Sequence, residues 1–369
     1  MQLNSLSISD LRNLKQLQVE LHPHLSIICG ENGSGKTSFL EAIHLLATGR
    51  SFRATQARQV ICFGKDACIV SGLVLPSMDV NSSAIRIGVE RLQNGSINMR
   101  IAEQDCHSIA ELAKQLPLQL INSESYEILE ASPKYRRQFL DWILFHVEQG
   151  FYPVWQRFRR ALQQRNAALK KGRACSHSEV RVWDNELAAM GFEIDQYRKA
   201  IIKEIIPIFK EIMRDLTKIK AGFQLQYLPG WNEEKALKEA LDHSFERDMA
   251  FGHTTVGPHR AELEFLVDGV AAKTVLSRGQ SKLFICALLM ARAKLLSQRE
   301  GRRCLFLIDD LGSELDQGAS TQLLEALMGL GSQVIVTCID PNPLLRVLRG
   351  AENTQFEIRN GEMCLKGST

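Results

Sequence analysis

A glycine-rich segment between an apolar run and a helical pattern restricts the fold more than any other feature of this sequence. Residues 30–37 read GENGSGKT and fit the pattern G-x-x-x-x-G-K-[ST]. The apolar residues 25–29 before it predict a buried strand, and apolar residues recur at helical spacing over residues 39–46. A strand, a glycine-rich turn and a helix in this order form a phosphate-binding loop, in which backbone N–H groups face phosphate oxygens. The sequence therefore predicts a nucleotide-binding α/β domain.

The residues of this loop have distinct expected roles. Lys36 would reach the β- and γ-phosphates, the Thr37 hydroxyl would ligate Mg²⁺, and the helix behind the loop adds its N-terminal dipole. A glycine-rich surface turn beside a solvated lysine would also fit the bare pattern, and the flanking strand and helix argue against it. The residues expected to bind the nucleotide are Gly30, Glu31, Asn32, Gly33, Ser34, Gly35, Lys36, Thr37 and Ser38.

The pattern of apolar residues divides the chain into two parts. The chain has 369 residues, which is more than one compact core usually takes. Residues 67–101 hold short alternating runs typical of antiparallel strands, and strand-like runs return in the last third of the chain. From residue 126 the pattern is almost wholly helical. We therefore expect an α/β domain formed by both chain ends, residues 1–125 and 250–369, with a mainly helical lobe inserted at residues 126–249.

Two consecutive aspartates follow a second apolar run. Residues 305–308 read LFLI and predict a buried strand, after which come Asp309 and Asp310. A carboxylate at this edge of a sheet can hold Mg²⁺ through water, and its neighbour can polarise an attacking water. Taken alone, two aspartates after a strand more often form a turn or a helix cap. With the phosphate loop they predict Asp309 as a magnesium ligand, and Asp309, Asp310 and Lys36 as catalytic groups.

A third motif stands just upstream of the acidic strand. Residues 276–282 read LSRGQSK and head an apolar helical pattern, which by itself would indicate a loop and helix cap. In this position they resemble the ABC-ATPase signature, a helix N-terminus that closes on ATP bound by a partner subunit. Residues 313–316, SELD, resemble the D-loop of the same superfamily. The resemblance implies a dimer with two ATP molecules at its interface, contacted by Ser277, Arg278, Gly279 and Gln280.

Five segments narrow the resemblance to the RecF family of bacterial DNA replication and repair proteins. They are residues 11–53, 116–142, 254–265, 276–282 and 305–316, and SPKYRRQFLDW and VGPHR within them are not general ABC features. The resemblance implies an ABC-type ATPase head with a helical lobe that dimerises on ATP and binds DNA at single-strand gaps or junctions. It further implies a weak, DNA-stimulated ATPase that acts as a switch and, with RecO-like and RecR-like mediator proteins, helps to load the RecA recombinase.

Several positions depart from the pattern of the superfamily. Transporters usually carry Glu where Asp310 stands, and Thr337 stands about where they have a switch His. Asn122 occupies the place of the Q-loop residue and is therefore implied to bind the nucleotide. Ala261 and Glu262 follow Arg260, where the family more often has two acids. The shorter acid and the missing His predict slow hydrolysis.

Basic residues concentrate in the helical lobe between residues 151 and 181. Such a strip can neutralise phosphates without reading base sequence, although a solvated helix face is an equally good interpretation. The aromatic residues at its start are expected in the core. Arg136, Arg137 and Arg53 could contact either DNA or nucleotide. The residues expected to bind DNA are Arg157, Arg159, Arg160, Arg165, Lys170, Lys171 and Arg173.

Composition restricts the kinds of binding site and the cellular location that we expect. Two other functions remain open. The formal charge of +3 is nearly balanced, so a nucleic-acid site would have to be a local patch. Nine cysteines without a C-x-x-C pair argue against a disulfide framework or a zinc site, and no signal peptide or membrane-spanning run is expected, which predicts a soluble cytoplasmic protein. The ATPase subunit of an ABC transporter would share the nucleotide motifs but not the helical insertion. A P-loop small-molecule kinase would not need the LSRGQSK motif.

Overall fold

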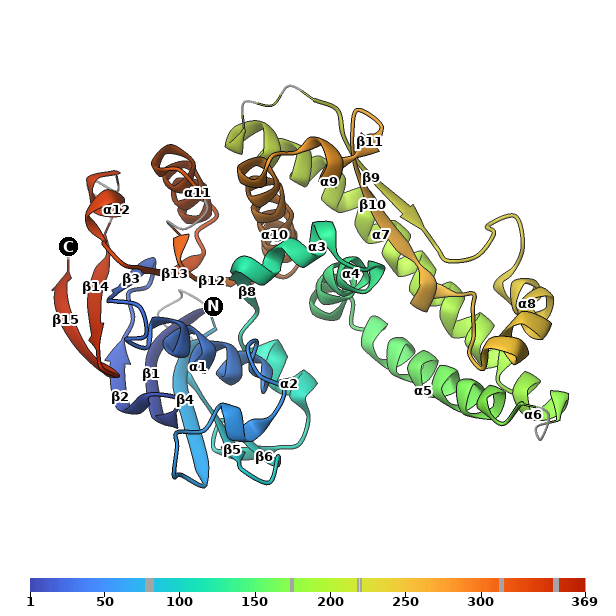
Figure 1. The fold of residues 1–369 in the computed structure, drawn as a ribbon, viewed down its shortest axis with the longest axis horizontal. Helices are drawn as coiled ribbons and strands as arrows, with labels where there is room; N and C mark the ends of the chain where they lie inside the picture. The colour runs from blue at the N-terminus through green and yellow to red at the C-terminus, as the bar shows by residue number, and fades with distance from the viewer. Residues whose placement is uncertain are drawn as a thin grey trace. The chain divides into compact units, whose positions relative to one another are not determined.

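The chain folds into two compact units in the computed structural model (Figure 1). The structure describes residues 1–76, 83–172, 176–217, 219, 221–311, 315–347 and 352–368. The first unit comprises residues 1–125 and 278–369, and the second comprises residues 126–277. Among the described residues, no helix combines the length and the apolar character that crossing a bilayer requires.

The central sheet of the first unit is built mainly from parallel strands. Its order is β15-β14-β3-β13-β12-β8, and only β15 runs antiparallel to its neighbour. Every residue of β3, β12 and β13 is buried, which is why these strands are mostly apolar in the sequence. The strands are β3 (Leu25–Cys29), β8 (Leu118–Ile121), β12 (Leu305–Ile308), β13 (Gln333–Cys338), β14 (Thr354–Arg359) and β15 (Glu362–Ser368).

A second, antiparallel sheet completes the first unit, in agreement with the alternating runs of the sequence. Its order is β2-β1-β4-β5-β6-β7. Its buried side chains, such as Leu6 and Val70, join one apolar core with Phe39 and Ile43 of helix α1 (Lys36–Thr48) and with Leu307 of β12. The strands are β1 (Gln2–Leu11), β2 (Leu14–Glu20), β4 (Ala67–Leu75), β5 (Ile85–Leu92), β6 (Ile97–Ile101) and β7 (Gln104–Cys106).

Helices and short segments connect the strands of the first unit. Helix α10 is the longest of them and begins directly after Ser277, the first serine of the LSRGQSK motif. The helices are α2 (Ile109–Gln115), α10 (Arg278–Glu300), α11 (Gln317–Gly329) and α12 (Asn342–Val347), with the short turns η1 (Ala57–Gln59) and η2 (Ser123–Tyr126).

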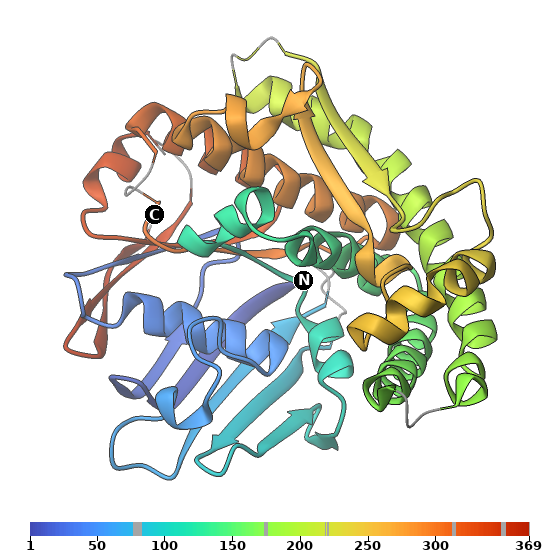
Figure 2. The ribbon, with the colours of Figure 1, turned by 45° about the vertical axis from the view of Figure 1, so that its right-hand side comes forward.

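The second unit is mainly helical, as expected, but it also contains a small sheet. In this sheet β10 (Glu262–Val267) pairs with β9 (Phe223–Leu228) and with β11 (Val270–Ala271), and α7 packs along β9 (Figure 2). The helices are α3 (Glu127–Glu130), α4 (Pro133–Val147), α5 (Phe151–Lys170), α6 (His177–Arg181), α7 (Asp184–Leu216), α8 (Leu237–Phe251) and α9 (Ala272–Val275), and η4 (Pro258–Arg260) precedes β10.

The β9–β10 pairing moves the second boundary between the units. The register runs from Glu262 opposite Leu228 to Val267 opposite Phe223. Because β9 lies within the inserted segment, its partner strand belongs to the same unit, and residues 250–277 group with the insertion. The boundary predicted at residue 250 is therefore too early. That prediction places β10 in the α/β domain formed by the chain ends, whereas β10 pairs with β9 of the insertion.

A buried arginine joins the helices of the second unit. The Arg165 side chain is fully buried on α5, and its Nε donates to Asp184 Oδ1 of α7 at 2.7 Å. Its Nη1 donates to Asp248 Oδ2 of α8 at 2.7 Å and to the Thr254 hydroxyl at 2.8 Å. Burial raises the pKa of Asp184, and the hydrogen bond from Arg165 opposes that rise. The cation thus offsets the cost of burying two carboxylates.

Replacing this arginine is expected to destabilise the second unit. Arg165→Met keeps most of the volume but leaves Asp184 and Asp248 without their cation, which should lower the free energy of unfolding by about 3–5 kcal/mol. Urea denaturation followed by circular dichroism measures the change. Arg160→Met, an exposed position on the same helix, is the matched control and should cost under about 0.5 kcal/mol. Equal effects of the two substitutions would contradict this assignment.

Candidate functional site

The glycine-rich loop connects β3 to α1 and requires glycine at both of its ends. At Gly30 (φ 156°) a Cβ atom would lie 2.5 Å from the Ile358 carbonyl oxygen. At Gly35 (φ 122°) it would lie 2.9 Å from Cδ2 of Leu14, and this φ is one that residues with side chains rarely adopt. Asn13 Nδ2 donates to the Ser34 carbonyl oxygen at 3.1 Å, so the β1–β2 turn holds the loop from one side.

Lys36 and Thr37 open α1 and project from the loop in different directions. Lys36 is buried, and its Nζ donates to the carbonyl oxygens of Gly30 at 2.7 Å and of Glu31 at 2.9 Å. The Thr37 hydroxyl donates to Asp309 Oδ1 at 3.2 Å. The ammonium group is therefore held against the loop, and the threonine hydroxyl points to the acid that follows β12.

Asp309 and Asp310 are positioned by a threonine on the neighbouring strand. The hydroxyl of Thr337, a fully buried residue of β13, donates to Asp309 Oδ1 at 2.8 Å and accepts from the Asp310 N–H at 2.9 Å. The Asp309 N–H donates to the Ile121 carbonyl oxygen of β8 at 2.9 Å. Asp310 has φ 52°, in the left-handed region that aspartate tolerates better than most residues. The strand edge therefore orients the Asp309 carboxylate and fixes the backbone of Asp310.

These groups surround one cavity of about 640 Å³, a volume typical of small-ligand sites. Eight of the residues predicted as site residues line it, namely Asn32, Gly33, Gly35, Lys36, Thr37, Ser38, Asp309 and Asp310. The remaining lining residues are Arg12, Asn13, Arg53 and Ser123. Three cations and two carboxylates thus share one hollow at the carboxyl ends of β3 and β12.

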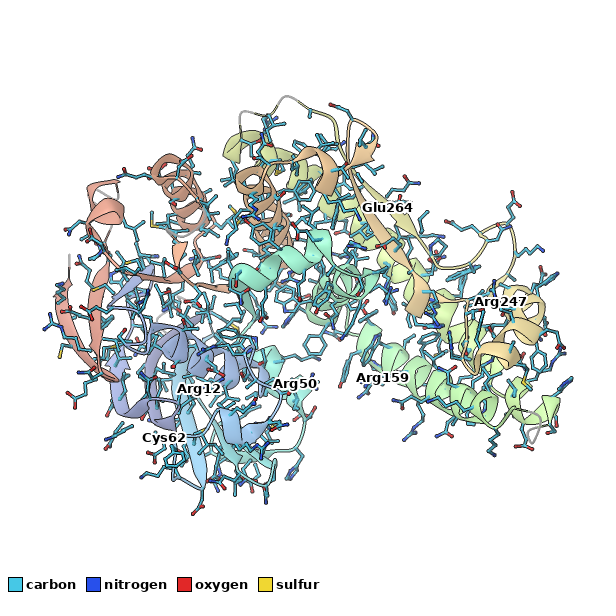
Figure 3. All side chains as sticks on the ribbon, viewed as in Figure 1. Arg12, Arg50, Cys62, Arg159, Arg247 and Glu264 are labelled. Atoms are coloured by element: carbon cyan, nitrogen blue, oxygen red, sulfur yellow. The ribbon has the colours of Figure 1, made fainter. Side chains whose placement is uncertain are left out.

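Two arginines of the cavity are tied to one buried carboxylate. Glu41 of α1 is fully buried and accepts two hydrogen bonds of 2.9 Å from the guanidinium of Arg12. Arg53 lies 3.6 Å from the same carboxylate, and the Ser51 hydroxyl donates to it at 2.5 Å. Arg12, labelled in Figure 3, was not predicted from the sequence, because only the pairing of β1 with β2 brings it beside the loop.

The other predicted nucleotide ligands lie outside this cavity. Gly30, Glu31 and Ser34 belong to the loop without lining the hollow. Asn122 is buried after β8, where its side-chain oxygen accepts from the Ser125 hydroxyl at 3.1 Å, and its neighbour Ser123 lines the cavity instead.

The signature and D-loop residues are also absent from the lining. Arg278, Gly279 and Gln280 form the first turn of α10, and the exposed Ser277 precedes it. None of these four lines the cavity. Of the D-loop, Ser313 and Glu314 lie outside the described residues, and Asp316 caps α11 by accepting from the Ala319 N–H at 2.8 Å.

The segments that contain SPKYRRQFLDW and VGPHR, which are not general ABC features, contact each other within the second unit. Arg136 and Glu262 form two hydrogen bonds of 2.6 and 2.8 Å, and Arg137 donates to the Ala261 carbonyl oxygen at 2.8 Å. Burial lowers the pKa of His259 to about 4, while its Nε2 lies 3.0 Å from the Thr254 carbonyl oxygen. These contacts give the segments a structural role in this unit, and the fully buried Ala261 has no room for a solvated acid.

The basic strip is only partly a surface feature. Arg165 is buried between two aspartates, so its prediction as a DNA contact is wrong. Sequence periodicity could have placed it inside, because it follows the buried Phe158 by seven residues on α5. Arg173 lies outside the described residues. Exposed members of the strip are Arg157, Arg159, Arg160, Lys170 and Lys171.

Two of the exposed basic residues lie near carboxylates. The aromatic residues at the start of the strip differ in burial. Arg157 lies 3.4 Å from Glu186, and Lys171 lies 3.4 Å from Glu179. Such exposed pairs contribute little stability. Among the aromatic residues, Phe151 and Phe158 are buried as predicted, whereas Tyr152 and Trp155 are only partly buried.

Comparison with known proteins shows which proteins the chain is similar to. Residues 2–357 match the model of the RecF/RecN/SMC N terminal domain. The chain is 44% identical over 344 residues to the DNA replication and repair protein RecF of Pseudomonas aeruginosa strain LESB58, covering 93% of this chain and 92% of that protein. It is 45% identical over 345 residues to the same protein of Stutzerimonas stutzeri strain A1501, with 93% and 92% covered.

Solved structures share the fold at lower sequence identity. The recombination mediator protein RecF-ATP of the RecFOR pathway superimposes with a TM-score of 0.87 at 24% identity, covering 99% of this chain and 98% of that one. An Smc head bound to the C-winged helix domain of ScpA gives 0.59 at 14% identity, covering 100% and 98%.

Thr337 offers a test of how the two aspartates are positioned. Thr337→Val is nearly isosteric but leaves the Asp310 N–H and one Asp309 contact unsatisfied in a buried place, which should lower the free energy of unfolding by about 1–3 kcal/mol. Misplacing the carboxylates should also weaken magnesium-dependent nucleotide binding, measured by calorimetry. Thr337→Ser keeps the hydroxyl and should preserve nucleotide binding. Full binding by the valine variant would show that this hydroxyl does not organise the site.

Proposed function

Because the chain belongs to the RecF family of DNA replication and repair proteins, we propose that it is an ATP-dependent DNA-binding protein of recombinational repair and replication-fork maintenance. In this proposal ATP brings two copies together on single-strand gaps or junctions of single- and double-stranded DNA. The dimer then helps RecO-like and RecR-like mediator proteins to load the RecA recombinase. The relatives named as DNA replication and repair proteins, and the RecF-ATP structure of the RecFOR pathway, support this assignment.

The observation that carries the nucleotide part is the 3.2 Å contact between Thr37 and Asp309 beside Lys36. Backbone N–H groups of the loop and the start of α1 favour a phosphate chain at this place. Lys36 would exchange its two carbonyl contacts for β- and γ-phosphate oxygens. Arg12 and Arg53 add positive charge to the wall of the same cavity, and Glu41 fixes the orientation of Arg12.

The donor atoms fit a magnesium ion. A hydroxyl and a carboxylate oxygen stand together at Thr37 and Asp309, and Mg²⁺ prefers such hard oxygen ligands supplemented by phosphates and water. When bound, the ion would offset the charge that develops on the phosphate oxygens. We assign Asp310 as the group that orients the attacking water, since its N–H is held by Thr337 and it lines the same cavity.

The signature residues are proposed to act on the nucleotide of a second copy. Ser277 and Arg278 are exposed at the start of α10, and neither lines the cavity. A helix N-terminus suits an anion such as a γ-phosphate. Two copies facing each other would therefore complete two sites, so nucleotide occupancy would control dimerisation.

The proposed DNA contacts are the exposed cations of the second unit, Arg157, Arg159, Arg160, Lys170 and Lys171. They would bind phosphates without regard to base sequence, with an affinity that falls as salt rises. A dimer would present two such strips to one DNA molecule. Because the dimer is proposed to form on ATP binding, DNA affinity would then depend on ATP.

The first prediction of this proposal concerns DNA binding. Gapped DNA should bind more tightly with ATP and Mg²⁺ than without them, and the binding should weaken as salt rises. Lys36→Met, which removes the phosphate ligand, and Ser277→Arg, which blocks the second copy, should both abolish the ATP effect. Lys273→Met alters an exposed lysine and should retain it. Anisotropy with labelled gapped and intact duplexes measures each case, and DNA binding that ignores ATP would refute the nucleotide-gated mechanism.

The second prediction concerns turnover. The short Asp310 side chain, and Thr337 in place of a switch His, should keep hydrolysis below about 1 s⁻¹ even with DNA present. Asp310→Asn removes the carboxylate that orients water and should slow hydrolysis by about 10²-fold or more while ATP still binds. Phosphate release in single-turnover experiments measures both. Faster turnover of the parent chain, or an unaffected asparagine variant, would contradict the assignment.

A further inference from the structure

We propose that Tyr152, Trp155 and Arg159 of α5 form a stacking platform that receives an unpaired base of single-stranded nucleic acid. The proposal rests on the DNA-binding function proposed above and names the form of DNA that one part of the basic strip takes.

The three side chains form a ladder along one face of the helix. The rings of Tyr152 and Trp155 are nearly parallel, with an interplanar angle of 15° and centroids 6.3 Å apart. The Arg159 guanidinium carbon lies 5.3 Å from the centroid of the Trp155 ring. Phe145 of α4 meets Tyr152 edge-on at 5.4 Å and supports the ladder from its N-terminal side. Both ladder rings are partly buried and Arg159, labelled in Figure 3, is exposed, so the outermost group of the stack faces solvent.

The surroundings of the ladder favour an anionic ligand. The 20 residues of α5 include no acidic side chain. Arg160 follows Arg159 directly, is exposed, and has no ion pair with any residue that the structure describes. Gln156 and Gln163 are exposed on the same helix and offer neutral hydrogen-bonding groups. A phosphate would find cations beside the platform without a competing carboxylate on this helix.

A second arginine over an aromatic ring in the same unit shows what a purely structural pair looks like. Arg181 lies 4.8 Å from the centroid of the Phe245 ring. Phe245 is buried, and Arg181 also lies 3.7 Å from the Asp242 carboxylate. In that pair the ring belongs to the core and the charge is partly neutralised. At Trp155 the ring is only partly buried, and its arginine has no such neutralising contact among the described residues.

The geometry selects unpaired bases over paired ones. A guanidinium plane that rests on an indole ring can stack a base on its outer side, and a base can also displace it from the ring. Bases within a duplex have their faces covered by their neighbours and cannot reach such a platform. The platform should therefore add affinity for single strands, while the neighbouring cations bind phosphates of either form.

The test compares an oligothymidylate of about 30 nucleotides with a duplex of the same length, both with ATP and Mg²⁺ present. Trp155→Ala should weaken binding of the oligothymidylate about 10-fold and change duplex binding less than about 2-fold. Arg159→Lys should have the same selective effect, since lysine keeps the charge but has no plane to stack on. Trp155→Phe, which keeps a ring, should restore most of the affinity. The oligothymidylate should also quench the tryptophan fluorescence of the parent chain more than that of Trp155→Ala.

Controls separate the platform from charge and from folding. Arg181→Lys changes the matched arginine–aromatic pair and should leave both affinities unchanged, and Arg160→Ala should lower both by a similar factor. Duplex binding monitors folding in every variant. If Trp155→Ala does not fold, Arg159→Lys alone tests the proposal. Unchanged single-strand binding in Arg159→Lys, or equal losses on both DNAs, would overturn the platform and leave the proposed function standing. A parent chain that binds neither DNA would overturn both.

Discussion

The proposed nucleotide site depends on the carboxylate of Asp309. It accepts hydrogen bonds from Thr37 at 3.2 Å and from Thr337 at 2.8 Å, and thereby connects helix α1, the edge of β12 and the neighbouring strand β13. Thr37 and Asp309 are 272 residues apart in the chain. Their contact exists only when both chain ends build one parallel sheet, in which β3 and β12 flank β13. Residues 126–277 consequently fold as a unit of their own, with a separate sheet and a separate buried charge network.

The features that could be predicted from the sequence are those encoded locally. A strand, a glycine-rich turn and a helix are consecutive, so the loop and the place of Lys36 at the start of α1 can be inferred from adjacent residues. The same holds for the aspartates after β12. Arg12 cannot be predicted in this way, because its place beside the loop comes from the pairing of β1 with β2 and from its hydrogen bond to Glu41, which is 29 residues away. The boundary at residue 250 failed for the same reason, because the partner of β10 lies in the insertion.

Helix α5 shows how position on a helix decides what an arginine does. Its buried residues include Phe158, Ala161 and Arg165, which recur at the spacing of one helix face. An arginine on that face must be neutralised, and Arg165 meets Asp184 and Asp248 for this reason. Arg159 lies on another face, where it keeps its charge available to solvent and rests on Trp155. Counting basic residues over a segment therefore overestimates its surface charge, whereas assigning each residue to a face separates the structural arginines from those that can meet a ligand.

The arrangement around Thr337 bears on why such a site would act as a switch. A histidine at this place could reach toward a γ-phosphate of the proposed nucleotide, but the Thr337 hydroxyl is buried and holds the Asp309 carboxylate and the Asp310 N–H instead. Within one chain the cavity thus holds the proposed phosphate ligands, while Ser277 and Arg278 do not line it. Under the proposed function, binding would precede completion of the site, and completion would require a second copy. Nucleotide binding energy would then be used to hold two copies together, and a weakly assisted water would keep that state long-lived enough for the DNA to be engaged.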